Sequence, residues 1–367
     1  NIPLRADAGD MAVLVQAEAQ AITLENAQRR LALSEVQGPV SFSLDQGIQA
    51  PALTAKLWQQ PLLASVRSED RKTRIEFQGN ASVAAVRDWL QAPWLLPASG
   101  ELLYQAELAL PAVDADVSLV VDADASGVEI DLPAPLGKRR GELDALALQF
   151  ASRDGAQDIQ LSHAGLVSAA LRLREGELER GNILLGGGTA RLPNQQGITI
   201  GGQVARLVVR DWVDYFSSSA PPAAGDEGFP LRELAVKAAG ANIYDLELTD
   251  AQLRATPGDS DWRFAVDSPT LVAALTMPDG YTARGVVPMN LEVQQVIVQT
   301  AAADADRATD ALLDIDPLQV PTLRASIQGA VVDNEDFGSW SFLVKPTQRG
   351  VVLTDLVGNI RGARVTG

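Results

Sequence analysis

Short runs in which apolar residues alternate with polar or small residues recur along most of the chain. Five clear examples are residues 40–44, 74–77, 146–150, 171–174 and 262–266. A period of two places successive side chains on opposite faces of a β-strand, so each run predicts a strand of about five or six residues with one apolar face. Glycine and proline stand mostly between the runs, where antiparallel strands turn. The pattern predicts a mainly β protein in which many strands follow one another in series.

Helical periodicity is confined to two short segments. In residues 82–91, Ser82 can cap a helix whose apolar side carries Trp89. In residues 207–216, Trp212 has the equivalent position on an apolar stripe. We expect each helix to cover an end or an edge of a block of strands, because an uncovered edge invites aggregation.

The two helices share a phrase, which suggests a division of the chain into modules. Arg-Asp-Trp-Leu occurs at residues 87–90 and Arg-Asp-Trp-Val at residues 210–213. A phrase that recurs at the ends of strand blocks predicts repeated modules. The three expected modules are residues 1–92 ending in helix 82–91, residues 93–220 ending in helix 207–216, and residues 221–367 with an acidic loop at 300–318.

The charge balance excludes several classes of partner. The 367 residues include 47 acidic and 30 basic side chains, which give a net charge of −17 at pH 7. Such a surface opposes binding to nucleic acid and to a general anionic membrane surface. The chain has no cysteine, so it has neither a disulfide framework nor a thiol nucleophile.

The apolar content predicts a folded protein without a membrane span. Hydrophobic residues make up 46% of the chain, enough for a sizeable buried face. No run of about 18 apolar residues is present, and the start at Asn1 has no signal-like segment. We therefore expect an excised soluble piece, and any membrane anchor must lie outside these residues.

Residues that could form an ordinary catalytic or phosphate-binding site are few. His163 is the only histidine, and its neighbours Leu161 and Ala164 fit a strand, so we interpret it as a strand residue rather than a general base or a zinc ligand. The glycines at 186–188 lack the phosphate-loop pattern and predict a bulge or a tight bend.

Four aspartates alternate with small apolar residues. Asp114, Asp116, Asp122 and Asp124 would lie on one side of a strand pair. A carboxylate pair serves glycosidases and calcium sites, but the spacing fits a solvated sheet face equally well, and we favour the face. We expect no catalytic residue, metal or cofactor.

Several short sequence motifs, in their order and spacing, resemble those of one protein family, and they extend over most of the chain. They lie at residues 57–62, 129–138, 182–188, 201–213 and 337–340. Together they resemble the YhdP proteins of the AsmA-like group. The resemblance implies a periplasmic segment of a protein anchored in the inner membrane of a Gram-negative bacterium, with a long curved β-sheet around an apolar groove. It supplies no signature catalytic residues.

The apolar strand positions are the candidate site. On pattern alone they fit the core of an ordinary β-sandwich. The resemblance implies instead an elongated, strongly curved and twisted antiparallel sheet whose apolar side chains line a groove for acyl chains. Each methylene removed from water contributes about 0.8 kcal/mol, so a chain of a dozen or more would gain on the order of 10 kcal/mol. The groove candidates are Phe42, Leu44, Ile75, Phe77, Leu146, Leu148, Phe150, Leu171, Leu173, Phe264, Val266, Trp340 and Phe342.

The resemblance thus implies a bridge-like lipid transport protein that carries phospholipid between the inner and outer membranes. Membrane contact would come through segments outside these residues, and envelope protein partners are not identified by the sequence. One alternative is a structural scaffold or adhesin-like module with a dry packed core, which predicts paired sheets and no continuous cleft. Another is an envelope carbohydrate-active enzyme that uses the aspartate pairs, which predicts exposed aromatic platforms, although aromatic residues are only 5% of the chain.

Overall fold

The computed structural model of the protein contains two units of β-structure. It describes residues 13–27, 30–69, 72–90, 95–111, 117–142, 144–153, 155–163, 165–174, 177–218, 231–243, 246–279, 287–299, 320–347 and 350–367. These ranges hold 22 strands and two helices, so the predicted mainly β class is confirmed. Contacts divide the chain into unit 1, Asn1–Gln196, and unit 2, Gly197–Gly367. The division into three repeated modules stays a prediction, and the acidic loop at 300–318 lies outside the described residues.

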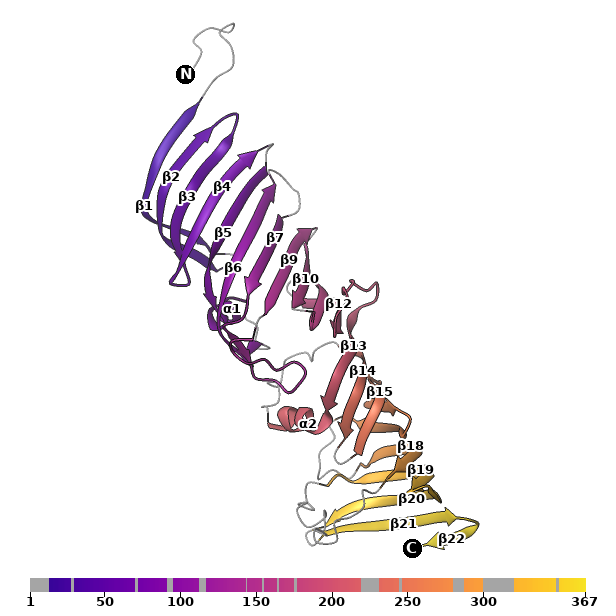
Figure 1. The fold of residues 1–367 in the computed structure, drawn as a ribbon. Coiled ribbons are helices and arrows are strands. Elements are labelled where there is room, and N and C mark those ends of the chain that lie inside the picture. Colours follow the sequence, from indigo (N-terminus) through magenta and orange to yellow (C-terminus); the bar gives the residue numbers. More distant parts are fainter. Residues whose placement is uncertain are drawn as a thin grey trace. The chain divides into compact units, whose positions relative to one another are not determined.

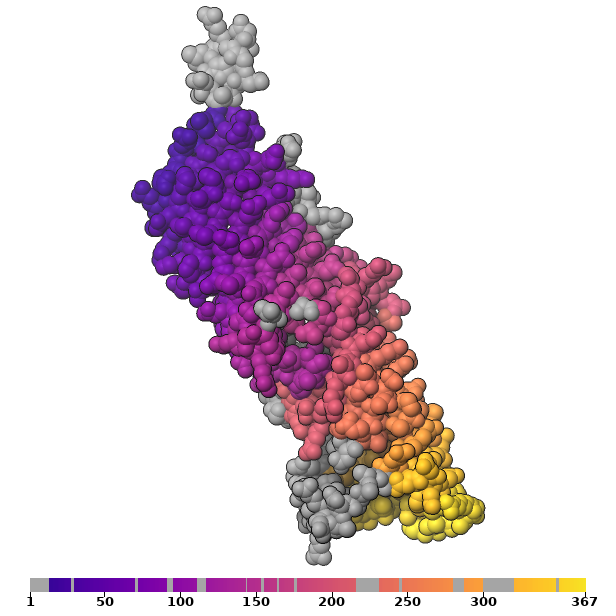
Figure 2. Space-filling view, viewed as in Figure 1, coloured from indigo at the N-terminus to yellow at the C-terminus, as the bar shows by residue number. Residues whose placement is uncertain are grey.

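Unit 1 is one curved sheet whose strands lie side by side almost entirely in chain order (Figure 1). Neighbours pair antiparallel throughout, and β7 pairs directly with β9 because the short β8 pairs with the beginning of β6. In the space-filling view the colours of this unit grade smoothly from indigo to magenta, as expected when each strand packs on the next (Figure 2). The elements are β1 (Leu14–Asn26), β2 (Leu31–Ser43), β3 (Gly47–Leu57), β4 (Gln60–Glu69), β5 (Lys72–Ser82), α1 (Val83–Leu90), β6 (Ala98–Pro111), β7 (Val117–Asp124), β8 (Val128–Ile130), β9 (Ala145–Arg153), β10 (Ala156–His163), β11 (Val167–Arg174) and β12 (Glu177–Leu185).

Unit 2 is a mixed sheet, which differs from the purely antiparallel sheet that was expected. The pairs β13–β14 and β18–β19 are parallel, and the other pairs are antiparallel. Between β13 and β14 the chain passes through α2, and a crossover of this kind lets two consecutive strands run in the same direction. The elements are β13 (Gly197–Val208), α2 (Val209–Ser218), β14 (Leu231–Ile243), β15 (Leu246–Pro257), β16 (Asp261–Asp267), β17 (Leu271–Pro278), β18 (Met289–Val298), β19 (Leu323–Val332), β20 (Glu335–Thr347), β21 (Gly350–Ile360) and β22 (Ala363–Thr366).

Many strands are longer than the predicted five or six residues. The strand β6 has 14 residues, and β2 and β14 have 13 each. Residues with positive φ interrupt the alternation without ending the strand. At Asp250 φ is +49°, and Leu248 and Ala251 are both buried although they lie three positions apart. Because such an irregularity bends the strand and resets the phase of its side chains, one long bent strand looks like shorter runs in the sequence.

The two helices lie where the sequence predicts them, with small shifts of their boundaries. The Ser82 hydroxyl accepts a hydrogen bond of 3.1 Å from the backbone N–H of Ala85, which confirms it as the cap of α1. The helix α2 begins two residues later than predicted because Leu207 and Val208 continue the ladder of β13 with β14. Within the described residues, no helix has the length and apolar character needed to cross a membrane.

Gly358 accommodates a large aromatic ring on the neighbouring strand. Gly358 of β21 lies opposite Trp340 of β20, and a Cβ on Gly358 would come within 2.6 Å of the ring. We therefore expect Gly358→Ala to displace the indole and to lower the free energy of unfolding by about 1–3 kcal/mol.

Urea unfolding monitored by far-UV circular dichroism measures this change. Gly240→Ala is the matched control, because its nearest non-neighbouring atom would lie 3.8 Å from the new Cβ. Equal midpoints for the two variants would contradict the predicted packing of Trp340.

Candidate functional site

The register of unit 1 brings the predicted apolar residues onto one face of the sheet. Residues that lie directly opposite each other in neighbouring strands share a face, so consecutive pairs can be followed across the sheet. One row contains Val66, Ile75, Leu108, Leu119, Phe150, Ile159 and Leu171, and a second contains Ala64, Phe77, Ala106, Val121, Leu148, Leu161 and Ala169. A third contains Leu62, Gly79, Tyr104, Ala123, Leu146 and His163. We call these three rows the apolar face of unit 1.

Six of the predicted residues of unit 1 belong to these rows, and a seventh adjoins them. The six are Ile75, Phe77, Leu146, Leu148, Phe150 and Leu171. They come from the three strands β5, β9 and β11, and the ladders place them on one face. Leu173 follows Leu171 by two positions on β11, so it points to the same side.

The four predicted residues of unit 2 form two rows of the same kind. Phe264 and Phe342 belong to one row, and Val266 and Trp340 belong to the next. The first row contains Ile200, Leu234, Ala255, Phe264, Leu275, Leu291, Ala325 and Phe342. The second contains Val236, Leu253, Val266, Ala273, Val293, Ile327 and Trp340. We call these rows the apolar face of unit 2.

Phe42 and Leu44 lie at the margin of the apolar face of unit 1. Phe42 is opposite Val15 of β1 and Ile48 of β3, and all three side chains are exposed. Leu44 lies in the turn after β2 and is 54% exposed. The structure therefore does not bring these two residues into the centre of the face.

Burial alternates along the strands and differs between large and small side chains. Ile75, Phe77 and Phe150 are half-buried, whereas the residues between them on the strands, such as Gln149, are exposed. Most of the buried hydrophobic positions hold alanine, and among the described residues the only large side chains below 2% exposure are Ile198 and Leu248. A two-layered sandwich would bury its large inner side chains. Both apolar faces thus keep accessible apolar surface.

The opposite face is polar and contains cross-strand ion pairs. Arg172 of β11 donates two hydrogen bonds of 2.6 Å to the carboxylate of Asp158 on β10. Asp122 and Asp124 are exposed, as expected for a solvated face. Hydrogen bonds from Ser126 hold the pKa of Asp124 below its usual value. Asp114 and Asp116 lie outside the described residues.

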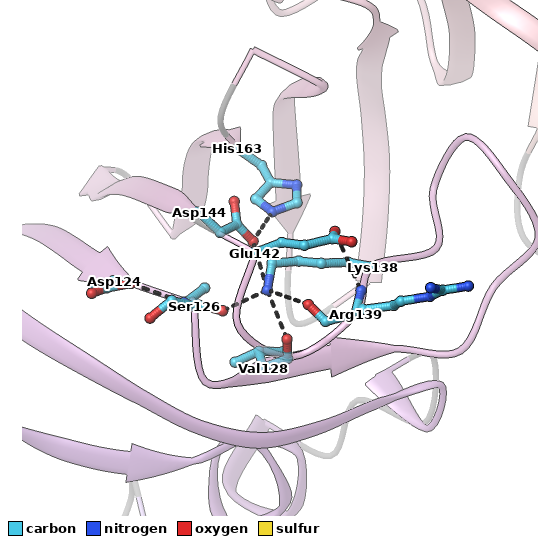
Figure 3. A network of polar contacts seen from close by, with 9 residues as sticks. Asp124, Ser126, Val128, Lys138, Arg139, Glu142, Asp144 and His163 are labelled. Atoms are coloured by element: carbon cyan, nitrogen blue, oxygen red, sulfur yellow. Dashed lines mark hydrogen bonds and ion pairs between the residues drawn. The ribbon is translucent and has the colours of Figure 1, made fainter.

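A buried polar network lies beside the start of β9 and the end of β10 (Figure 3). The Lys138 ammonium donates hydrogen bonds to the carbonyls of Ala125 (2.9 Å) and Val128 (2.7 Å) and lies 3.7 Å from the Asp144 carboxylate. His163 Nε2 is 2.6 Å from Asp144 Oδ2. Both Lys138 and Asp144 are 7% exposed. The network fixes the loop after β8 against the ends of β9 and β10.

The position of His163 on a strand was predicted, but its buried partner was not. A histidine beside a buried carboxylate occurs in hydrolases, where the other ring nitrogen faces a nucleophilic hydroxyl or thiol. In the part of the chain that the structure describes, no serine or threonine hydroxyl bonds to His163. Nor do the described residues contain three or more His, Cys, Asp or Glu side chains grouped as a metal site. The geometry therefore supports a structural role for the network.

Lys138→Met tests this structural role. The change leaves the Asp144 carboxylate buried without its cation and removes a donor from two carbonyls, so it should cost about 3–5 kcal/mol of unfolding free energy. Urea unfolding measures the loss. Arg140→Met, at an exposed position two residues away, should leave the midpoint almost unchanged. A Lys138→Met midpoint equal to that of Arg140→Met would refute the structural role.

A small hollow near α1 was not predicted from the sequence. Arg30, Trp58, Ala85, Asp88 and Trp89 line a cavity of about 330 Å³. The two indole rings have centroids 5.6 Å apart and are tilted by 46°. These residues come from two turns and a helix that are far apart in the sequence, so no local pattern could have joined them.

Comparison with known families gives one match over the full chain. The family model described as YhdP protein matches residues 1–367. No curated protein and no solved structure matches the chain.

Proposed function

The chain belongs to the YhdP family, and on this premise we propose that it is a periplasmic segment of a bridge-like lipid transport protein. In this proposal the apolar faces hold the acyl chains of phospholipids, and the polar headgroups stay in water at the open side. Other segments of the protein reach the inner and outer membranes, and envelope proteins assist at either end.

The observation that carries the proposal is the unbroken run of apolar pairs across successive strands. In unit 1 a row passes from Val66 to Leu171 through seven strands without a charged residue. Its large side chains are half-buried, so apolar area is left for a ligand. Each methylene placed on such a surface gains up to about 0.8 kcal/mol, which makes an acyl chain a favourable occupant.

The composition of the rows also supports movement along them. Aliphatic side chains make weak, non-directional contacts that are similar at each position. A chain of methylenes therefore meets no strongly preferred site and can shift from one strand to the next. A site for a fixed ligand would instead place a few polar groups to orient it.

Photo-crosslinking tests whether the apolar faces contact lipid. With p-benzoylphenylalanine at Phe150 or Phe264, the purified chain should capture radiolabelled phospholipid from vesicles after irradiation. The controls carry the probe at Gln149 and Arg263, which are adjacent exposed positions on the same strands. Because neighbouring residues point to opposite faces, capture should be at least about tenfold lower in the controls. Equal capture by both sets would remove the support for the proposal.

Two negative charges on opposite strands should prevent lipid from binding to the apolar face of unit 1 and should leave the backbone hydrogen bonds between the strands intact. Leu148 and Leu161 are directly opposite on β9 and β10, so Leu148→Asp with Leu161→Asp places two carboxylates in the middle of a row. The cost of desolvating them should reduce lipid capture at least about tenfold.

The matched control is Ala147→Asp with Ser162→Asp, the neighbouring pair on the exposed side of the same two strands. It should keep its lipid capture, and circular dichroism should show strands in both variants. A folded Leu148/Leu161 variant that captures lipid like the control would contradict a role for this row in holding acyl chains.

A further inference from the structure

The hollow beside α1 lies at one end of the sheet of unit 1. Arg30 precedes β2, Trp58 follows β3, and α1 follows β5. Alternate strands run in opposite directions, so these three points meet at the same end of the ladder. The hollow is widely open to solvent, and its volume of about 330 Å³ is at the lower end of the range for ligand-binding sites.

Trp58 has a backbone conformation that a bulky side chain rarely adopts. Its φ is +52° and that of Gln59 is +67°, in a turn where asparagine and glycine are the favoured residues. The Trp58 indole packs beside Trp89 of α1, which holds it in this turn. Strained conformations of this kind cluster at binding sites, where the surrounding structure holds them.

The lining of the hollow combines a cationic and an anionic side chain with two indole rings. The Arg30 guanidinium donates one hydrogen bond of 2.9 Å to the carbonyl of Trp89, and its remaining N–H groups suit a phosphate. The Asp88 carboxylate is exposed, and Arg87 Nε approaches it to 3.4 Å. An ammonium group is attracted both by a carboxylate and by the face of an indole. A ligand that carries a phosphate and an ammonium a few bonds apart would match all of these groups.

The hollow adjoins the apolar face of unit 1. Trp58 and Val86 pack against the buried cluster that contains Leu62, Ala81 and Tyr104. Leu62 and Tyr104 belong to the third row of that face. Burial in this cluster also raises the pKa of the Tyr104 hydroxyl, so the surroundings of the row have low polarity at this end.

We propose that the hollow formed by Arg30, Trp58, Asp88 and Trp89 binds the headgroup of a zwitterionic phospholipid. Arg30 holds the phosphate, and the indole rings with Asp88 hold the ammonium of a phosphoethanolamine or similar group. This inference rests on the proposed function, in which the acyl chains of the same lipid lie on the apolar face. A glycerol headgroup lacks the ammonium, so an anionic phospholipid loses the contacts with Asp88 and the indoles.

The test measures which lipid the purified chain takes from mixed vesicles. The chain is incubated with vesicles of equal parts phosphatidylethanolamine and phosphatidylglycerol, separated from them, and its lipids are identified by mass spectrometry. The wild-type chain should be enriched in phosphatidylethanolamine by about threefold or more. Arg30→Gln with Asp88→Asn should capture the same total lipid with a ratio near one. Arg140→Gln with Asp122→Asn makes the same change of charge at exposed positions and should keep the wild-type ratio.

The outcomes separate this inference from the proposed function. Lipid capture by the wild-type chain without enrichment, or enrichment kept by the Arg30/Asp88 variant, overturns the headgroup site and leaves lipid carriage standing. Absence of any captured lipid overturns the proposed function.

A soluble headgroup compound then tests whether the hollow binds the headgroup in the absence of acyl chains. In spectra of the ¹⁵N-labelled chain, glycerophosphoethanolamine should shift the indole N–H signals of Trp58 and Trp89, and inorganic phosphate should not. If neither compound shifts them, the hollow does not bind this headgroup. If both shift them equally, it is a phosphate site without selectivity for the ammonium, and the inference is wrong.

Discussion

The backbone ladder between neighbouring strands is the interaction on which each unit depends. A sandwich gains much of its stability from a dry core between two sheets, but here few large side chains are fully buried. Stability must therefore come from hydrogen bonds along long strands and from apolar contacts between adjacent strands. The same arrangement keeps the side chains of one face in register from strand to strand. A surface with a defined apolar face follows from the ladder itself.

Alanine has a specific place in this arrangement. The buried positions of unit 1 include Ala55, Ala81, Ala106 and Ala123, and each lies opposite a larger side chain on a neighbouring strand. A small residue lets neighbouring large side chains approach the sheet, and a bent strand needs such space on its inner side. On the polar face, by contrast, long charged side chains contact each other across strands, as in the bidentate pair of Arg172 with Asp158. The two faces therefore differ in size pattern as well as in polarity.

The class of the fold and the composition of the apolar rows were predictable from the sequence. Alternation at Ile75 and Phe77, or at Leu146 to Phe150, is a local pattern, and the structure confirms the strands that it predicts. Strand length was not predictable, because residues such as Asp250 take a left-handed conformation that no local signal specifies. The parallel pairing of β13 with β14 was missed because it depends on where the chain returns after α2. The network of Lys138, Asp144 and His163 and the hollow near Trp58 join residues that are distant in sequence, so they needed the fold.

Pairing in chain order within unit 1 has a consequence for how the protein reaches its native state. Almost every ladder joins strands that are consecutive or nearly so, which keeps the loops that must close short. Proteins with such local contacts fold faster than β-proteins whose strands pair across the chain. Each new hairpin can add to an existing edge as soon as its residues are available. If the sheet grows from one end in this way, only the most recently added strand has an unpaired edge at any time.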